Sequence, residues 1–424
     1  MESAATSEMV KSKMCSDSPP RAMDRTMLVL FDRLRSQFPE RLLDLQVWTR
    51  GRAYEVFQPA PSEPHQSDTS KPRYSVGCIE GLLQAITMEV LHQRTQVDLF
   101  AEASSYLPEL RPAIGTSASD RLKVVHLLAH ATGFHSTNKA IIGDWQQVLE
   151  HLRTKGASFP PGTVCSWNGL GRRLLEELII RVTGKAMSEL TLTTIGELGV
   201  FTQAERRLES SSEDIMLELD ELARLIRQAF RHGGPAARLL TDRGASIPVI
   251  RHPVSPRSSY PIAYASGLAK YSSGLWGQNG IGPGYSLAIR FTSDLEDMIA
   301  IAAAVPPLAR DLVISLVETT ISGAVPVQAR GPIGSVIGCD WQEVAGTYVA
   351  DDEEFIVVEL GCDLLLCSVW RGPELLARLD LRVTNGDILV ADPRWSSFQV
   401  EFFKHPESSV ACLTLGQVTY IRSV

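Results

Sequence analysis

Residues 74–81 read Tyr74-Ser75-Val76-Gly77-Cys78-Ile79-Glu80-Gly81, and an apolar helical pattern begins inside this stretch. The apolar residues recur three and four positions apart, as on one face of a helix, at Ile79, Leu82, Leu83, Ile86 and Val90. Asp98-Leu99 and Tyr106-Leu107-Pro108 come next along the chain. We therefore expect Cys78 to lie at the N-terminal end of a buried helix.

Further short motifs follow in residues 121–240, where the pattern is mainly helical. They are Val125-His126-Leu127-Leu128-Ala129-His130-Ala131-Thr132-Gly133, Phe159-Pro160-Pro161-Gly162-Thr163 and Val182-Thr183-Gly184-Lys185. Their order along the chain restricts the fold more than any one of them does alone.

In order and spacing these motifs resemble the serine β-lactamase, penicillin-binding-protein and esterase superfamily. In that family a Ser-x-x-Lys motif opens the helix, and Asp-Leu and Tyr-Leu-Pro follow at fixed distances. Placing Cys78 on the serine position brings Asp98 and Tyr106 into register without a gap. The resemblance covers roughly residues 25–320. It implies an α+β fold in which an antiparallel sheet is flanked by helices and accompanied by an all-helical subdomain.

The reactive positions that this resemblance implies are substituted in the chain. Gly81 stands at the position of the lysine of the first motif. The Pro-Pro-Gly-Thr motif places the second reactive motif so that its tyrosine is Trp167 and its asparagine is Gly169. The lysine or histidine of the third motif is Gln278, whereas its glycine remains as Gly280. A serine-type mechanism cannot run on this set of side chains.

A cysteine nucleophile could work without the lost lysine and tyrosine side chains, because a thiol is easier to ionise than a hydroxyl. A thiol ionises near pH 8.5, and the dipoles of a helix N-terminus favour the thiolate. Cys78 could therefore be activated without the lysine and the tyrosine. Glu80 is the titratable residue of the first helical turn. It could act as a weak base, or its charge could simply complement the helix dipole. We predict Cys78, Glu80 and Gln278 as catalytic candidates.

The remaining candidates are expected to bind substrate. Gln278 and Asn279 could orient a carbonyl group, and the backbone amides of Cys78 and of a residue near Gly280 or Ile281 could form an oxyanion hole. The complete predicted substrate-binding set is Gly81, Trp167, Gly169, Asn279, Gly280 and Ile281.

Structural interpretations compete with each of these assignments. Unpaired cysteines are more often inert buried residues than nucleophiles. Trp167 could be core or pocket wall, because an indole donates one hydrogen bond but cannot shuttle a proton. Gln278 and Asn279 could sit solvated on a loop.

Histidines and tyrosines offer further alternatives to the lost groups. His126 and His130 are expected to pack the helical region, and His92 is expected at the surface. Three tyrosines could supply a replacement hydroxyl, and the sequence does not choose among them: Tyr260, Tyr264 and Tyr271.

Bulk properties exclude several classes of function. The 424 residues are 44% hydrophobic and 21% charged, as in a globular protein, and the net charge of −8 argues against nucleic acid or an anionic membrane as partner. The seven scattered cysteines indicate reduced thiols, and no metal-ligand spacing occurs. Residues 1–20 contain no apolar signal region. We expect a cytoplasmic protein that binds a small-molecule substrate and needs no cofactor, while its oligomeric state stays open.

The organisation of the chain follows from shifts in pattern. We expect residues 1–22 to be a disordered tail and residues 23–330 to form the β-lactamase-like domain, with its helical subdomain at about 115–245. Strand-like runs then recur at short intervals, with an Asn385-Gly386 turn signal between two of them. Residues 340–424 are therefore expected to form a separate all-β barrel, and relatives of the resembled superfamily carry a lipocalin-like domain there.

Three functions remain open on the sequence. The first is an acyl-transfer enzyme of secondary metabolism that acts on a small ester, thioester or amide through Cys78. The second is a non-covalent cyclase or isomerase that uses the same cavity, lined by Trp167 and Gln278. The third is a non-catalytic binding protein with a β-lactamase-like core.

Overall fold

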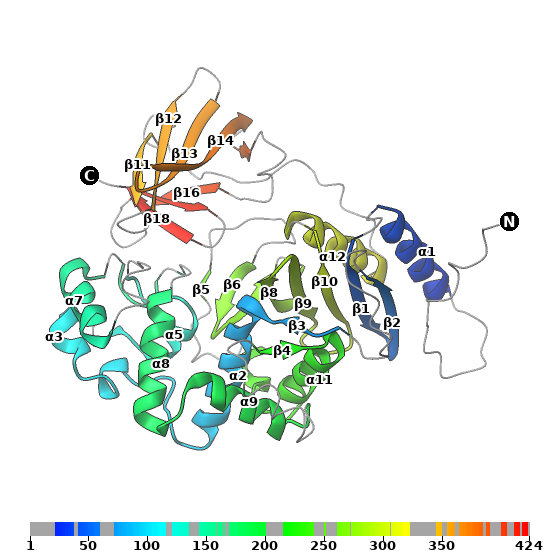
Figure 1. Ribbon diagram of the computed structural model, residues 1–424, viewed down its shortest axis with the longest axis horizontal. Helices are drawn as coiled ribbons and strands as arrows, with labels where there is room; N and C mark the ends of the chain where they lie inside the picture. The colour runs from blue at the N-terminus through cyan, green and yellow to red at the C-terminus, as the bar shows by residue number, and fades with distance from the viewer. Residues whose placement is uncertain are drawn as a thin grey trace. The chain divides into compact units, whose positions relative to one another are not determined.

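The computed structural model of the protein (Figure 1) describes most of the chain. The described residues are 22–37, 41–59, 72–115, 121–134, 144–157, 159–163, 165, 169–200, 215–240, 250–251, 261–271, 273–305, 307–322, 345–349, 354–360, 364–384, 387–390, 400–404, 411–415 and 418–422. The chain divides into two compact units, of which the first comprises Met1–Gln93, Met187–Gly244 and Leu268–Gln328 and the second comprises Arg94–Ala186, Ala245–Gly267 and Ala329–Val424.

The first unit is built on an antiparallel sheet with helices on both faces. Its strands follow the order β2-β1-β10-β9-β8-β7. The strands are β1 (Leu43–Thr49), β2 (Arg52–Gln58), β7 (Leu268–Tyr271), β8 (Trp276–Gly282), β9 (Tyr285–Phe291) and β10 (Met298–Ala303). The helices are α1 (Ala22–Gln37), α2 (Glu80–Gln93), α9 (Met187–Glu197), α11 (Leu219–Phe230) and α12 (Pro307–Ser322). Short 3₁₀ turns, η1 (Gly77–Ile79) and η3 (Ala237–Leu240), and a two-stranded ribbon of β3 (Tyr74–Ser75) and β4 (Met216–Leu217) complete it.

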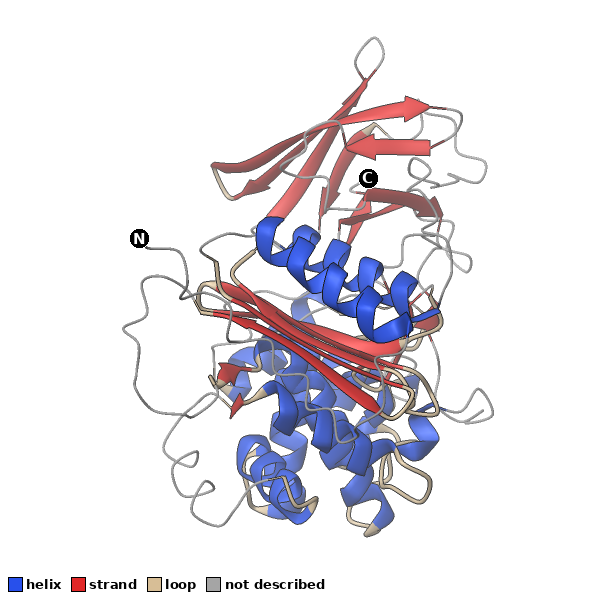
Figure 2. Ribbon diagram, turned by 90° about the vertical axis from the view of Figure 1, so that its right-hand side faces the viewer, coloured by secondary structure: helices blue, strands red, loops and turns tan. Residues whose placement is uncertain are grey.

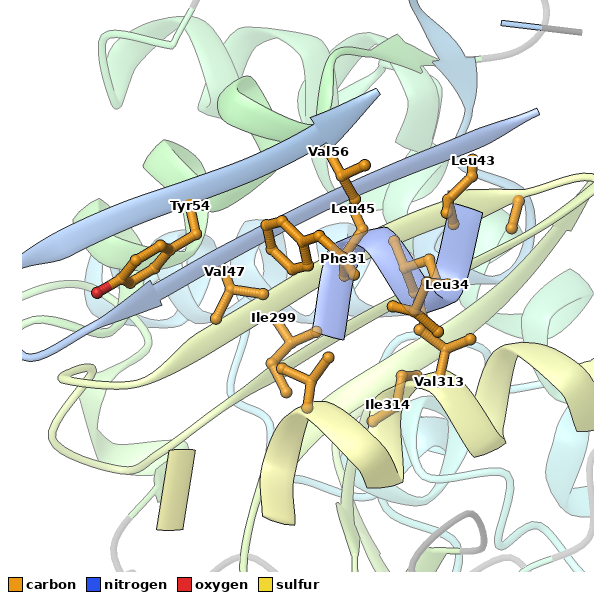
Figure 3. Close-up of a cluster of buried hydrophobic side chains, with 14 of the residues drawn as sticks. Phe31, Leu34, Leu43, Leu45, Val47, Tyr54, Val56, Ile299, Val313 and Ile314 are labelled. Atoms are coloured by element: carbon orange, nitrogen blue, oxygen red, sulfur yellow. The ribbon is translucent and has the colours of Figure 1, made fainter. Parts of the chain in front are cut away.

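One face of this sheet is covered by the two helices that begin and end the unit. Phe31 and Leu34 of α1 and Val313 and Ile314 of α12 pack on sheet residues such as Leu45, and all of them are buried. Figure 3 shows these side chains pointing toward one another, and Figure 2 shows the two helices lying across the sheet. Burial of each such side chain contributes about 1.5–3 kcal/mol, so this layer is a main source of the unit's stability.

The other face of the sheet receives α2 and α11. The α11 helix contacts β10, and the ring of Phe230 lies 5.3 Å from the ring of Phe291. Every residue of α2 from Leu82 to Leu91 is buried, although some of these residues are polar. The helix is therefore an interior element, and the turn at its N-terminal end is held by the surrounding core.

The helices and strands expected in this unit are confirmed, with one correction. The β1 and β9 strands have the expected bounds, and the β1–β2 hairpin turns at Arg50 and Gly51, whose φ angles of 49° and 75° suit a two-residue hairpin turn. The amphipathic pattern of residues 212–230 predicts one helix, but in the structure α11 begins only at Leu219. Met216 and Leu217 pair instead with β3, and a capping box at Glu218 then starts the helix.

The second unit contains a helical part and the C-terminal strands. Its helices are α3 (Leu110–Ile114), α5 (Val124–Leu128), α7 (Trp145–Lys155) and α8 (Gly169–Thr183), with a 3₁₀ turn η2 (Ala103–Ser105), and α5 contacts α8 while α3 contacts α7. Asp144 caps α7 by accepting a hydrogen bond from the Gln147 amide, and Gly156, with a φ of 63°, ends that helix. The short strands β5 (Ile250–Arg251) and β6 (Pro261–Ala265) pair antiparallel.

The C-terminal strands form a sheet of their own, as expected. They are β11 (Gly346–Val349), β12 (Glu354–Leu360), β13 (Leu364–Arg371), β14 (Glu374–Thr384), β15 (Asp387–Val390), β16 (Val400–Lys404), β17 (Ala411–Leu415) and β18 (Val418–Arg422). Their order, β15-β14-β13-β12-β11-β18-β17-β16, is that of an up-and-down meander. The end strands β15 and β16 also contact each other, but within the described residues no hydrogen-bonded ladder closes a barrel. The expected hairpin joins β14 to β15, and its two turn residues, 385 and 386, lie outside the described residues.

Candidate active site

Cys78 lies in the 3₁₀ turn η1, directly before α2. The Val76 amide donates a hydrogen bond to the Ile215 carbonyl at 3.0 Å, and the Ile79 amide donates to the Val76 carbonyl at 3.0 Å. These bonds hold the turn on both sides of Cys78, whose side chain is exposed. The α-helix itself begins at Glu80, so the cysteine precedes the helix rather than belonging to its first turn.

The η1 turn is in backbone contact with β8. A Cβ atom on Gly77 would lie 2.3 Å from the Ile281 carbonyl oxygen and 3.0 Å from the Ile281 nitrogen. A Cβ atom on Gly280 would lie 2.6 Å from the Val76 carbonyl oxygen. Only glycine fits both positions, and the φ of 50° at Gly77 also favours glycine. The cysteine turn and the end of β8 are therefore adjacent, which is the arrangement that two amide donors for a carbonyl oxygen require.

The first turn of α2 has free space at Gly81, the position of the lysine in the Ser-x-x-Lys motif. A Cβ atom on Gly81 would have no heavy atom within 4 Å. The glycine is therefore not imposed by packing, and a longer side chain fits there. Glu80 is half-buried and accepts a hydrogen bond from the Gln84 side chain at 3.1 Å.

Gln278 and Asn279 of β8 point to opposite faces of the sheet. Neighbouring strand residues alternate in direction, so Gln278 shares the face of Gly280, where Ile79 lies. Gln278 is buried, and its side-chain oxygen accepts a hydrogen bond from the Asn279 amide at 3.1 Å. Asn279 takes the other face, and its Oδ1 accepts a hydrogen bond from Arg290 Nη2 at 2.6 Å. The expectation that both side chains orient one carbonyl is corrected: Asn279 braces the sheet.

The brace on that other face is a buried arginine. Arg290 is 1% exposed, and its guanidinium carbon lies 3.6 Å from the centre of the Tyr271 ring. It donates hydrogen bonds to the Gln278 carbonyl at 3.2 Å and the Ile289 carbonyl at 2.9 Å. The guanidinium thereby fixes the backbone of β8 beside the cysteine turn.

The other expected site residues fall into three groups. Trp167 lies outside the described residues, as does Tyr260. Gly169, the first residue of α8, and Tyr264 belong to the second unit. Tyr271 is buried beneath Arg290 and does not serve the cysteine turn.

His126 behaves as the expected packing residue. It is buried, its Nδ1 accepts a hydrogen bond from the Lys123 amide at 3.3 Å, and a Cβ atom on Gly162 would lie 2.8 Å from its Nε2. Burial, aided by the charge of Lys123, lowers its pKa to about 4. The neutral ring is therefore wedged under the Pro-Pro-Gly-Thr loop.

Two residues near the cysteine were not singled out from the sequence. Gly77 makes the contact between η1 and β8, and its place immediately before the cysteine was the available signal. Tyr285 donates a hydrogen bond from its hydroxyl to the Ser75 carbonyl at 3.3 Å, and its ring lies 5.2 Å from that of Tyr74. Its position within a strand-like run gave no such signal.

Exposure distinguishes the cysteines that the structure describes. Cys165 and Cys367 are buried. Burial raises the pKa of the Cys165 thiol far above its usual range and that of Cys367 to about 12, so both are unreactive at neutral pH. Among the cysteines whose side chains the structure describes, Cys78 is the exposed one.

Among the described residues, no three histidine, cysteine or acidic side chains are grouped as metal ligands would be. Likewise, no helix among them combines the length and the apolarity that a membrane span needs.

Comparison with known proteins gives a family match over part of the chain and a shared fold. A family model for Beta-lactamase matches residues 50–201. The fold is shared with the crystal structure of SurE with D-Leu, at 16% identity and a TM-score of 0.66, over 95% of this chain and 99% of that one. The family match covers this part of the chain, and the solved structure shows the same fold.

Two further solved structures share the fold. The octameric penicillin-binding protein homologue from Pyrococcus abyssi has 15% identity and a TM-score of 0.52, over 95% of this chain and 100% of that one. A class C β-lactamase in complex with cefoxitin has 15% identity and a TM-score of 0.52, over 72% of this chain and 99% of that one. A comparison with curated protein sequences finds no match. The expected β-lactamase-like α+β fold is thus confirmed.

Proposed function

We propose that the protein is an acyl-transfer enzyme in which Cys78 takes the place of the serine nucleophile. The observation that carries the proposal is the exposed Cys78 in a turn whose backbone contacts β8 at Gly280 and Ile281. This contact supports an oxyanion hole made of the Cys78 amide and of one amide near Gly280 or Ile281. The substrate is a small ester, thioester or amide, and the proposal includes a cytoplasmic role in secondary metabolism.

The reaction has two balanced steps. The Cys78 thiolate attacks the acyl carbon, the carbonyl electron pair moves to oxygen, and the tetrahedral adduct expels the leaving group to give an acyl thioester on Cys78. Water or a second nucleophile then attacks that thioester, and the Cys78 thiolate leaves. Gln278, whose side chain shares the face of Gly280, would position the acyl group.

The absence of a lysine side chain at Gly81 limits which leaving groups the enzyme can expel. An amine must be protonated before it leaves, and the lysine that could help to move that proton is absent. A thiolate leaves without a proton. We therefore expect thioesters to be turned over faster than esters, and esters faster than amides, when the acyl group is the same.

A trapping experiment tests the nucleophile. The protein is incubated with a phenyl thioester, quenched in acid and examined by intact-mass and peptide mass spectrometry. We expect one acyl group on Cys78 and none in Cys78→Ala, which should also lose turnover at least about 100-fold. Wild-type turnover in Cys78→Ala would contradict the covalent mechanism.

Restoring the first motif provides a matched test of the site. Cys78→Ser combined with Gly81→Lys should gain ester hydrolysis over Cys78→Ser combined with Gly81→Ala, because the space beside Gly81 accepts the lysine. Equal activity of the two double variants would show that position 81 does not face the nucleophile.

The second candidate is a non-covalent cyclase or isomerase, and the lack of a lysine at Gly81 favours it. That reaction would use Gln278 and the amides without the sulfur. It predicts substantial turnover in Cys78→Ala and loss of turnover in Gln278→Ala. A binding protein without catalysis would show ligand binding and no turnover in any variant.

A further inference from the structure

The first unit has a cavity away from Cys78, and its lining is rich in arginine. Its volume is about 570 Å³, and it is lined by Trp48, Arg50, Gly51, Arg52, Ala53, Arg227, Leu295 and Glu296. The β1–β2 hairpin supplies the first five of these, α11 supplies Arg227, and the turn between β9 and β10 supplies the last two. This volume is within the usual range of small-molecule pockets.

The strand register separates this cavity from the cysteine turn. Trp48 pairs with Met298, which pairs with Phe291 and then Trp276 across the sheet. Ile281, beside the cysteine turn, lies at the other end of β8. At about 3.4 Å per residue, Trp276 and Ile281 are about 17 Å apart along that strand, so the cavity is a separate site.

The arginines give the cavity a positive lining. The lining contains three arginines, Arg50, Arg52 and Arg227, and one acidic residue, Glu296. Neighbouring acids are engaged elsewhere: Asp297 Oδ1 accepts a hydrogen bond from Thr49 Oγ1 at 2.6 Å, and Asp294 accepts one from the Glu296 amide at 3.0 Å. A guanidinium stays protonated at neutral pH, so the lining keeps a charge that suits a dianion.

Arg227 lies over the ring of Trp48. Its guanidinium carbon lies 5.0 Å from the centre of the Trp48 ring, a distance at which cation and ring attract each other. Stacking on a ring holds the planar group in one orientation, so its N–H donors are positioned before a ligand arrives. Burial lowers the pKa of Arg227, which reflects the water that its charge has lost, while the charge of Asp220 opposes this effect.

The hairpin geometry places the other two arginines on either side of one glycine. Arg50 has a φ of 49° and Gly51 a φ of 75°, so the chain reverses between Arg50 and Arg52. Arg50 is exposed and Arg52 is half-buried. The tight turn thus carries two of the arginines that line the cavity, and α11 carries the third, Arg227.

We propose that this cavity binds a small organic anion of two or three charges, either a phosphate monoester or a di- or tricarboxylate, through Arg50, Arg52 and Arg227. Arginine forks match phosphate and carboxylate oxygens in pairs, and the apolar parts of Trp48 and Leu295 leave room for an organic portion. Because the site is separate from Cys78, its occupation is independent of the chemistry proposed there.

Isothermal titration calorimetry on the full chain tests the proposal with two probes, phenyl phosphate and citrate. We expect at least one to bind with a Kd below about 1 mM, and the probe that binds identifies the kind of anion. Arg50→Gln and Arg227→Gln should each weaken that binding at least tenfold. Glu296→Gln should strengthen it several-fold, because the one lining carboxylate is removed.

The matched control is Arg224→Gln, one turn earlier on α11, where the arginine is exposed and does not line the cavity. It should change the Kd less than twofold. If neither probe binds at 10 mM (about tenfold above the expected Kd), the proposal is wrong. If Arg224→Gln and Arg227→Gln weaken binding equally, net charge rather than this cavity drives the interaction, and the proposal is also wrong. Arg50 is at an exposed turn, so its variant keeps the test valid even if Arg227→Gln fails to fold.

Discussion

Replacing Gly77 by alanine should both destabilise the first unit and disturb the cysteine turn. Gly77 has a φ of 50°, and an added Cβ would lie 2.3 Å from the Ile281 carbonyl oxygen. The left-handed conformation costs a residue with a Cβ about 1–2 kcal/mol. Relief of the contact needs a backbone shift, for which overpacking costs of about 1–3 kcal/mol apply. We expect the free energy of unfolding to fall by about 2–5 kcal/mol.

The assay combines urea denaturation with the rate at which iodoacetamide alkylates Cys78. Gly81→Ala is the matched control, because its Cβ meets nothing within 4 Å and alanine favours a helix over glycine by about 0.5–1 kcal/mol. Gly77→Ala should lose stability and change the alkylation rate, while Gly81→Ala should gain stability slightly. A loss below about 1 kcal/mol in Gly77→Ala, with an unchanged rate, would refute the contact between η1 and β8.

Three further outcomes follow from burial and charge. Peptide mapping after brief iodoacetamide treatment should show Cys78 alkylated at least about 100-fold faster than Cys165, since only the former is exposed and burial raises the pKa of the latter. The unfolded chain protonates His126 near pH 6.5, whereas the folded chain does so only at about 4, so the free energy of unfolding should fall as the pH drops between these values, and His126→Gln should flatten that slope. Glu89 is fully buried and paired with Arg238, and burial raises the pKa of its carboxyl. Arg238→Met should therefore cost about 3–5 kcal/mol at pH 7, less at pH 5, and adding Glu89→Gln should restore most of it; equal urea curves would contradict this.

Local pattern predicted the elements of the first unit well, because burial of one face is encoded in nearby residues. The apolar spacing from Ile79 to Val90 marks α2, and alternation marks β1 and β9. The start of α11 was predicted too early because Met216 and Leu217 extend the apolar pattern. Their pairing with β3 is a long-range interaction that periodicity cannot show.

The site was predictable in position and less so in orientation. Motif spacing placed Cys78 and β8 together without any side-chain information. The opposite directions of Gln278 and Asn279 depend on which sheet face packs on α12, and that helix, Pro307–Ser322, lies well beyond them in the sequence. The role of Arg290 was hidden for the same reason, since its partners lie on β7 and β8 as well as on its own strand.

The glycines of this site explain how the fold can be kept while the reactive groups change. Gly77 and Gly280 make the contact between η1 and β8 through backbone atoms alone. Amide donors from these segments therefore survive any substitution of the lysine, tyrosine or histidine of the family, and packing at Gly81 neither requires a lysine nor excludes one. The retained glycines thus keep the backbone around the proposed site, where Cys78 presents an exposed side chain.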